Sequence, residues 1–384
     1  MSKPSVAVIF GSRSSEHDVS IITALVSIIA PLELTGKYNV VPVYITKEGV
    51  WYSDPRLSDV ELFSSGKIDS YLSKLKPISL SFDGGLTLIE PGLRTKQTKI
   101  DLVFPSLHGT YGEDGSIMGL FEMAGVAYVG CDKVASAICM DKVLARDVAG
   151  VAGVKMNKYE WFYGYDFEQN KDQVLKKLEK LKYPLFVKPV HLGSSIAISK
   201  VSSKSELINA IEVALYYDNK VIVEEAVSNL VEVTIPLIGN SEILAANVEE
   251  PDQGDKFFDF DTKYMRQGKS KANDSSKGAQ GYSHIPARIS EDMSAKAVEI
   301  AKRVYKAIGC SGITRVDLLI DSKTKDIYFN EANPLPGSLS IHNWKTVGIS
   351  NIELVEKLIA YAQERFTQNQ KLNTTFATNF LKQF

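Results

Sequence analysis

Two short segments in the last quarter of the chain combine acidic, basic and amide side chains. Arg315 and Asp317 are two residues apart, and so are Glu331 and Asn333. Because side chains alternate between the two faces of a strand, each pair should share one face. Two carboxylates and an amide oxygen suit Mg²⁺, and an arginine beside them can hold phosphate or a developing oxyanion. An ordinary solvated hairpin would show the same pattern, so both interpretations stay open at this point.

A second candidate site follows a buried apolar run. Lys188 ends the run Leu185-Phe-Val, and Gly193-Ser194-Ser195 follows after a short interval. A lysine charge and the backbone N–H groups of a Gly-Ser loop can together bind phosphate oxygens. The spacing is not that of a P-loop, so a surface lysine beside a flexible turn is the alternative.

Two weaker signals point to nucleotide and amino-acid binding. One is a predicted strand end whose backbone can bond an adenine edge, with an acid further on for ribose hydroxyls: Glu224, Glu225, Ala226, Val227 and Glu232. The other is Glu16, near the start of a predicted helix, which is either a cap acid or a ligand for an ammonium group. His108, before Gly109, is equally ambiguous by itself.

The composition is that of an ordinary globular protein and excludes several classes. With 384 residues, 44% of them hydrophobic, the chain has room for two or three packed subdomains. A formal net charge of −2 gives no nucleic-acid or membrane-surface bias. The three cysteines have no metal-ligand spacing and are predicted to be reduced thiols of a cytoplasmic protein. The apolar run 21–34 is too short for a bilayer and is predicted to be a buried helix.

The elements that must position these residues fall into three units. Strand, loop, helix and strand at Val6–Phe10, 11–18, Val19–Ala30 and Val40–Ile45 predict a parallel α/β unit with a ligand crevice after the first strand. Gly84-Gly85 predicts a hairpin turn. A second unit begins near Cys131, with one helix predicted over 134–148. A third holds strands at 232–238, 243–248, 315–320 and 327–330, and its polar stretch 267–283 predicts a mobile loop.

Read together, these segments resemble the D-alanine–D-alanine ligase family along nearly the whole chain. Six ordered segments carry the resemblance: Gly11-Ser-Arg-Ser-Ser-Glu16-His-Asp-Val-Ser20, His108-Gly-Thr-Tyr-Gly-Glu-Asp-Gly115, Ser136-Ala-Ile-Cys-Met-Asp-Lys142, Lys188-Pro189 with Gly193-Ser194-Ser195, Phe258-Asp-Phe-Asp-Thr-Lys263-Tyr264, and Arg315-Val-Asp317 with Glu331-Ala-Asn333-Pro-Leu-Pro-Gly337. Six matches in order are far more specific than any one of them.

The resemblance implies an α/β ATP-grasp fold of three domains. These would be an N-terminal parallel α/β substrate domain over 1–130, a central ATP-lid domain over 131–231, and a C-terminal catalytic domain over 232–384 with a mobile loop at 257–283. It also implies ATP and two Mg²⁺ (or Mn²⁺) ions as cofactors, D-alanine as substrate, a homodimer, and no nucleic-acid or membrane partner.

The resemblance further implies residue roles. Contacts to ATP would come from Lys142, Lys188 and Ser195 at the phosphates, from Glu224, Glu225, Ala226 and Val227 at adenine, and from Glu232 at ribose. The metal ligands would be Asp317, Glu331 and Asn333. Glu16, with His108 nearby, would bind the first D-alanine, and Arg315 with the N–H of Gly337 would stabilise the oxyanion. Glu16, Ser194 and Tyr264 would form a hydrogen-bonded clamp over the site.

Departures from the family pattern keep the second substrate open. Ala197 replaces a glycine, the segment before Glu232 is one residue longer, and Pro336–Trp344 differs from the usual PGMTxxSL run. One register of this loop places Ser340 against the acceptor and the other places His342 there, with Lys263 as a positive partner in both. The alternatives are a ligase with D-serine, D-lactate or another amino acid as acceptor, and a non-catalytic nucleotide-binding relative. Tyr264 argues against D-lactate, since dipeptide-forming relatives carry tyrosine there.

Overall fold

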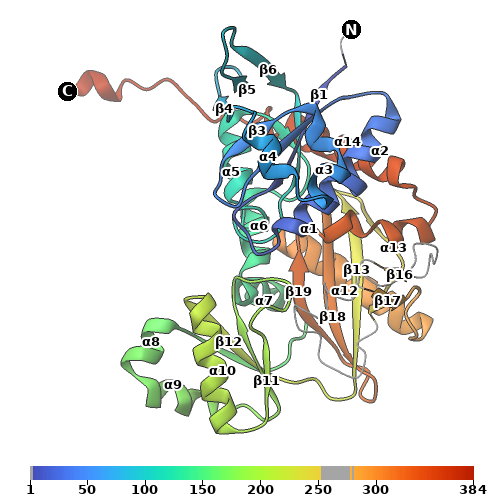
Figure 1. Ribbon diagram of the computed structural model, residues 1–384. Helices are drawn as coiled ribbons and strands as arrows, with labels where there is room; N and C mark the ends of the chain where they lie inside the picture. Colours follow the sequence, from blue (N-terminus) through green and yellow to red (C-terminus); the bar gives the residue numbers. More distant parts are fainter. Residues whose placement is uncertain (1–2, 252–276, 279–280) are drawn as a thin grey trace.

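A computed structural model describes residues 3–251, 277–278 and 281–384 of the chain (Figure 1). Five sheets are present in this part of the chain, and the three larger ones each belong to one of the predicted units. The predicted loop 257–283, with Lys263 and Tyr264, lies almost wholly outside the described residues. Its mobility therefore stays a prediction.

The N-terminal unit is built on a sheet in the order β3-β2-β1-β7-β8. Its strands are β1 Ser5–Gly11, β2 Asn39–Ile45, β3 Trp51–Ser53, β7 Leu102–Ser106 and β8 Ala127–Tyr128. The central strand β1 is parallel to β2 and β7, as the sequence predicted, and only the edge strand β3 is antiparallel. Residues 6–10 are fully buried, which is typical of a parallel strand covered on both faces.

Helices cover this sheet, and a small antiparallel sheet extends it. The further elements are α1 His17–Ile22, π-helical η1 Thr23–Ile29, α2 Ala30–Thr35, η2 Pro55–Ser58, α3 Val60–Ser64, α4 Ile68–Leu72, β4 Ser79–Ser81, β5 Leu86–Glu90, β6 Lys96–Ile100 and α5 Ser116–Ala124. The turn between β4 and β5 contains Gly84-Gly85, which confirms the predicted hairpin. The continuous helical segment His17–Thr35 is long and apolar enough to cross a membrane, but 56% of its most apolar window is buried inside the protein. Ile28 and Leu32 lie in the N-terminal core, as predicted for a buried helix.

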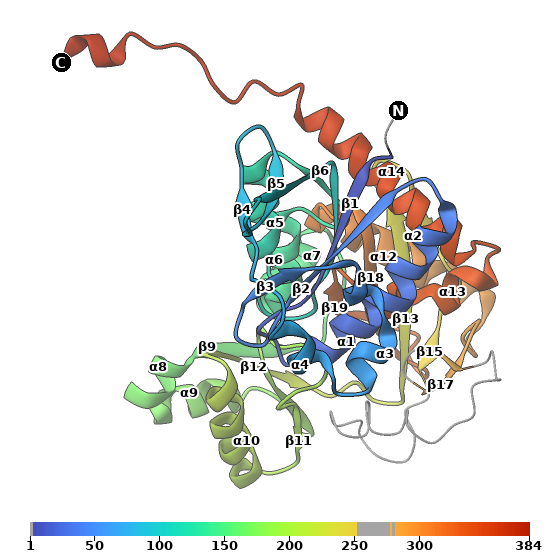
Figure 2. The same cartoon turned by 45° about the horizontal axis from the view of Figure 1, so that its top comes forward.

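The central unit projects from the rest of the protein except for its first two helices, which pack against the C-terminal unit (Figures 1 and 2). Its antiparallel sheet has the order β11-β10-β12-β9. Its elements are α6 Lys133–Met140, α7 Lys142–Val151, β9 Tyr159–Tyr163, α8 Gly164–Gln169, α9 Lys171–Leu178, β10 Leu185–Pro189, β11 Ser199–Val201, α10 Lys204–Tyr217 and β12 Lys220–Glu225. Helix α10 packs Ile211 on Leu185, Val187 and Val223 of the sheet.

The single helix predicted over 134–148 is wrong, because the chain breaks between α6 and α7. Asp141 has extended backbone angles, φ −86° and ψ 104°. Its Oδ1 accepts hydrogen bonds from the N–H groups of Val143 at 2.8 Å and Leu144 at 3.0 Å. An aspartate that satisfies these groups starts a new helix. The apolar periodicity continues through the break, which is why the pattern alone suggested one helix.

The C-terminal unit carries the antiparallel sheet β14-β13-β18-β19. Its elements are β13 Leu230–Gly239, β14 Ile243–Ala245, β15 Glu250–Pro251, β16 Lys277–Gly278, β17 Gly281–His284, α12 Glu291–Ile308, β18 Gly312–Asp321, β19 Ile327–Asn333, η4 Gly337–Ser340, α13 Ile341–Thr346, α14 Asn351–Asn369 and η5 Phe380–Gln383. Strand β19 runs three residues beyond the predicted end at Asn330, so Glu331 and Asn333 stand in the sheet. The residues after α14 are exposed and extend away from the body (Figure 2).

Candidate active site

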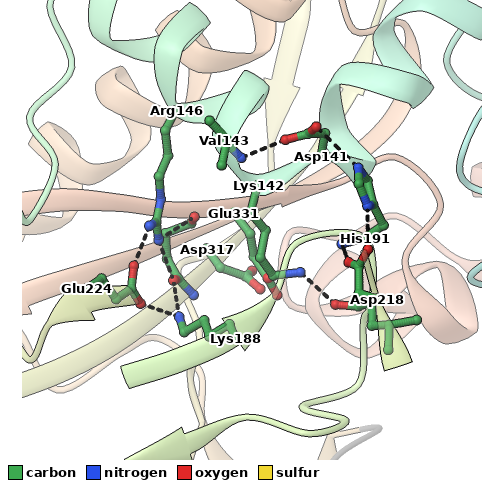
Figure 3. A network of polar contacts seen from close by, with 12 residues as sticks. Asp141, Lys142, Val143, Arg146, Lys188, His191, Asp218, Glu224, Asp317 and Glu331 are labelled. Carbon is green, nitrogen blue, oxygen red and sulfur yellow. Dashed lines mark hydrogen bonds and ion pairs between the residues drawn. The ribbon is translucent and has the colours of Figure 1, made fainter. Parts of the chain in front are cut away.

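Helix α7 directs two cations from one face toward the central and C-terminal sheets (Figure 3). Lys142 and Arg146 are four residues apart, so they share a helix face. The Lys142 ammonium donates to the carbonyl of Leu192 at 2.6 Å and lies 3.7 Å from Oε2 of Glu331. Both side chains are buried, Arg146 completely. Asp141, which caps the N-terminus of α7, therefore fixes the start of the helix that carries both cations.

Glu224 on β12 is the buried anion between two cations. Arg146 and Lys188 each form an ion pair with one of its carboxylate oxygens. Although burial alone would raise it, the pKa of Glu224 falls to about 2, because Arg146 and Lys188 stabilise the charged form. Asn330 on β19 joins the cluster, since its Oδ1 lies 3.3 Å from the Lys188 ammonium and 3.5 Å from Arg146. The cluster therefore ties the lid sheet to the C-terminal sheet.

The β18–β19 hairpin places the four predicted metal and oxyanion residues at one end. Arg315 lies opposite Asn333 in the register, and Asp317 lies opposite Glu331. The Arg315 guanidinium donates to both Asp317 oxygens at 2.7 Å in a bidentate pair. Although burial opposes it, Asp317, Glu331 and Glu249 raise the pKa of Arg315, so it stays charged.

The donor set at this end of the hairpin fits Mg²⁺. Two carboxylates and an amide on adjacent strands supply hard oxygen ligands, and Asp317 is buried while Glu331 is partly exposed. Asn333 Oδ1 accepts the N–H of Leu335 at 3.0 Å, which fixes its side chain. Within the described residues there is no group of three or more His, Cys, Asp or Glu that could hold a metal by itself. A metal here would therefore need further oxygens from elsewhere, such as a phosphate.

Glu16 lies where the N-terminal unit meets the loop between β10 and β11, residues 190–198, which is called the lid loop below. It is buried, and its carboxylate accepts a hydrogen bond from the hydroxyl of Ser194, 178 residues away in the chain. A Cβ on Gly109 would approach Glu16 Oε2 to 2.8 Å, and one on Gly193 would approach it to 3.3 Å. Gly109, with a φ of +71°, leaves room for this close approach, and Gly193 brings a third loop next to the same carboxylate.

The lid loop takes the left-handed conformation at three residues other than glycine. Their φ values are 54° at Ser194, 59° at Ser195 and 55° at Ala197. Glycine adopts this conformation without the steric cost of a Cβ, which explains the family glycine at the position of Ala197. Ala197 takes this conformation at the steric cost that its Cβ adds.

His108 is buried and connects the N-terminal unit to the loop after Gly337. Its Nδ1 lies 3.6 Å from Glu113, and its Nε2 contacts the hydroxyl of Thr23 at 3.2 Å. The same hydroxyl accepts the N–H of Ser338 at 3.1 Å. Burial opposes protonation, but Glu113 and then Glu16 raise the pKa of His108.

The loop after Pro336 has three consecutive left-handed residues. The φ values of Ser338, Leu339 and Ser340 lie between 51° and 52°. Ser340 is buried, and His342 contacts Glu249 through Nε2 at 3.0 Å. Burial alone would raise the pKa of Glu249, but His342 lowers it overall. The structure thus ties His342 to the carboxylate of Glu249.

The predicted adenine segment already uses part of its backbone inside the protein. The N–H of Glu225 donates to Lys158 O at 2.9 Å, and its C=O accepts from Asn157 at 2.7 Å. The N–H of Ala226 donates to Pro184 O at 3.0 Å. Glu232 lies on β13, opposite Leu319 of β18.

Sequence reasoning missed several residues that build this site. They are Arg146, Asn330, Thr23, Glu113 and Glu249. Two of them carried a local signal: Arg146 is four residues from Lys142 on a helix, and Glu113 is five residues from His108 in the same quoted segment. Thr23, Asn330 and Glu249 reach the site through contacts between distant parts of the chain.

Three α/β units that meet around paired lysines and a carboxylate hairpin define an enzyme of the ATP-grasp fold. Sequence profiles of the D-ala D-ala ligase N-terminus and C-terminus match residues 5–131 and 148–360. The chain therefore belongs to the D-alanine–D-alanine ligase family.

Similar proteins support this assignment over nearly full length. The chain is 39% identical to the D-alanine–D-alanine ligase of Chloroherpeton thalassium, over 96% of this chain and 99% of the relative. A solved VanG D-Ala:D-Ser ligase from Enterococcus faecalis is 33% identical with a TM-score of 0.77, over 94% of this chain and 100% of that one. The D-alanine–D-alanine ligase of Coxiella burnetii is 26% identical with a TM-score of 0.80, over 97% of both chains.

Proposed function

We propose that the protein joins two D-alanine molecules in an ATP-dependent reaction through an acyl phosphate. The observation that carries this proposal is a set of three ion pairs between the lid and the C-terminal sheet: Lys142 with Glu331, Arg315 with Asp317, and Lys188 with Glu224. A carboxylate that attacks the γ-phosphate of ATP brings two anions together. The three cations offset that repulsion and align the reacting groups.

The metal ligands in this proposal are Asp317, Glu331 and Asn333, which would hold two Mg²⁺ ions. The bound metal supplies positive charge at the phosphates. Arg315 lies beside these ligands, so its guanidinium and the N–H of Gly337 stabilise the oxyanion that forms when the second amine attacks. The bidentate pair of Arg315 with Asp317 holds the guanidinium in this orientation.

The first D-alanine binds with its ammonium at Glu16, near His108. The bond from Ser194 to Glu16 supports this assignment, because it brings the lid loop over the same carboxylate. Tyr264 completes the clamp and Lys263 binds the acceptor carboxylate; both lie outside the described residues. With the clamp closed, water is kept from the acyl phosphate, which it would otherwise hydrolyse.

The nucleotide lies between the lid and the C-terminal sheet. Lys142, Lys188 and Ser195 contact its phosphates and Glu232 its ribose. Since Glu225 and the N–H of Ala226 have internal backbone partners, the adenine contacts fall mainly to the carbonyl of Ala226 and the backbone of Val227. We assign the domains as residues 1–130, 131–231 and 232–384, in a cytoplasmic homodimer.

Product analysis tests this proposal directly. The protein is incubated with ATP, Mg²⁺ and a mixture of D-alanine, D-serine and D-lactate, and the products are identified by mass spectrometry. We expect D-alanyl-D-alanine, with phosphate release that depends on the added D-amino acid. Phosphate release that does not depend on the added D-amino acid, or the absence of any phosphate release, would contradict ligase activity.

A D-alanine–D-serine ligase is the second candidate. The loop Pro336–Trp344 departs from the family run at the predicted acceptor pocket, and one similar solved structure is a D-Ala:D-Ser ligase. Dominant D-alanyl-D-serine in the same mixture would favour this candidate.

The acceptor loop gives a prediction about Ser340. Ser340→Ala should raise the KM for the acceptor amino acid by about ten- to a hundredfold, because it removes a charge-assisted hydrogen bond of roughly 1.5–3 kcal/mol. His342→Ala should change it less, because the His342 imidazole is already bound to Glu249. Steady-state kinetics with only the acceptor varied measure both. A larger effect in His342→Ala would assign the contact to His342, and no effect in either variant would reject both registers.

A further inference from the structure

His191, which none of the assigned roles uses, lies at the base of the lid loop between two carboxylates (Figure 3). Its Nδ1 is 3.0 Å from Oδ1 of Asp218, and its Nε2 is 3.2 Å from Oδ2 of Asp141. The backbone N–H of His191 also donates to Asp218 at 2.6 Å. Both ring nitrogens can donate only in the imidazolium, so this arrangement selects the charged form.

The two carboxylates come from different elements of the lid unit. Asp141 caps the N-terminus of α7, and Asp218 is the residue that ends α10. Lys220 on β12 donates a hydrogen bond to Asp141 Oδ2 at 2.7 Å. Its ammonium also makes cation–π contacts with the rings of Trp161 and Tyr163. Two carboxylates and two cations balance in charge, so removal of the imidazolium charge leaves one negative charge in excess.

The neighbours of His191 hold the phosphate-binding lysine. The backbone N–H of Lys142 donates to the carbonyl of Val190 at 3.3 Å, and its ammonium donates to the carbonyl of Leu192 at 2.6 Å. His191 lies between these two carbonyls in the chain. Ser194, three residues further, is the donor to Glu16. One anchored histidine therefore fixes the segment that contacts both Lys142 and Glu16.

We propose that His191 is a positioning residue whose imidazolium fixes the base of the lid loop to Asp141 and Asp218, and so orients Lys142 toward the nucleotide phosphates. This inference rests on the proposed function, because it assigns the phosphates to Lys142. His191 itself touches neither nucleotide nor amino acid.

The charge state of His191 supports this role. Hydrogen bonds to Asp141 and Asp218 raise the pKa of His191 to about 9. With this raised pKa, the imidazolium that bonds to both carboxylates predominates at neutral pH and is lost as the pH rises through about 9. The charged groups that face His191 are Asp141, Asp218 and, through Asp141, Lys220. Lys142 also titrates in the alkaline range, because burial lowers its pKa, so the test must separate it from His191.

Two substitutions at His191 separate charge from shape. His191→Gln removes the charge and leaves donors on one amide only, whereas His191→Arg keeps a charge that does not titrate in this range. Asp218→Asn weakens the anchor from the other side. The control is Glu212→Gln, which removes an exposed ion pair with Lys171 at 3.2 Å on the same helix α10. Thermal unfolding checks that each variant is folded.

Binding of Mg²⁺–ADP by calorimetry is the main measurement, with amide hydrogen exchange of residues 190–197 beside it. We expect about tenfold weaker binding and faster exchange in His191→Gln and Asp218→Asn. Binding within about twofold of wild type is expected in His191→Arg and Glu212→Gln. In turnover, the KM for ATP should rise in His191→Gln and stay near the wild-type value in His191→Arg and Glu212→Gln.

The pH dependence gives a second, independent readout. Wild-type affinity for Mg²⁺–ADP should fall as the pH passes about 9, and the part of this fall that comes from His191 should be absent in His191→Arg, whose side chain keeps its charge. The same alkaline fall in both proteins, or wild-type affinity and exchange in His191→Gln, would overturn the role of His191. If the wild-type protein does not bind Mg²⁺–ADP at all, the proposed function fails and this inference fails with it.

Discussion

Asp317→Asn and Glu331→Gln are each expected to lower kcat by at least about a thousandfold while the protein stays folded. Both residues are paired across the β18–β19 hairpin, where a metal bound to the nucleotide phosphates needs anionic ligands. The amides keep the size and part of the hydrogen bonding of the acids but lose the charge. Phosphate release at saturating ATP and D-alanine, over a titration of Mg²⁺, measures the effect.

Asp326→Asn is the matched control for these variants. Asp326 lies at the other end of the hairpin, where it forms a largely exposed ion pair with Lys155 at 2.8 Å. An exposed pair contributes at most about 1 kcal/mol, so this variant should keep wild-type turnover. Near-normal Mg²⁺-dependent activity in Asp317→Asn or Glu331→Gln would reject the metal assignment.

Glu224→Gln should destabilise the protein by about 3–5 kcal/mol and also weaken nucleotide binding. The substitution leaves the fully buried Arg146 and the lid lysine Lys188 without their shared anion, and a buried charge that loses its partner carries a large desolvation cost. Denaturant unfolding compared with wild type measures the loss. Glu160→Gln on the adjacent strand β9 removes the surface pair with Lys177 and should cost less than about 1 kcal/mol. Equal stability of both variants would show that the buried cluster contributes nothing net.

The same cluster predicts a pH dependence in acid. The pKa of Glu224 is depressed to about 2 in the folded protein. The ion pairs of Glu224 therefore contribute fully to the free energy of unfolding above the ordinary glutamate pKa of 4.5. This contribution is lost as the pH falls from about 4.5 toward 2. Wild type should therefore lose stability faster than Glu224→Gln over that window, and parallel curves would contradict this assignment of the charge.

The parts of the site that depend on local pattern were predictable from sequence. Alternation within β18 and β19 correctly placed Arg315 with Asp317 and Glu331 with Asn333, since strand side chains repeat every two residues. The parallel N-terminal sheet followed from the order of strand, loop and helix. The break at Asp141 was missed, because an N-cap aspartate inside a continuous apolar pattern resembles a polar helix position.

The remaining contacts depend on chain segments that meet only in the folded protein. Arg146 reaches Glu224 and Asn330 across 78 and 184 residues, respectively. His342 reaches Glu249 across 93 residues. No periodicity encodes such pairs, and a buried arginine is uncommon enough that a solvated helix face is the default expectation for Arg146.

The hydrogen bond from Ser194 to Glu16 has a thermodynamic consequence. In the proposed function it joins the loop that covers the nucleotide to the carboxylate that binds the first amino acid, so the occupancy of each site changes the free energy of ordering the other. Such coupling is reciprocal: the factor by which ATP tightens D-alanine binding equals the factor by which D-alanine tightens ATP binding. In the proposed function, the hydroxyl of Ser194 therefore makes the two substrates mutual effectors.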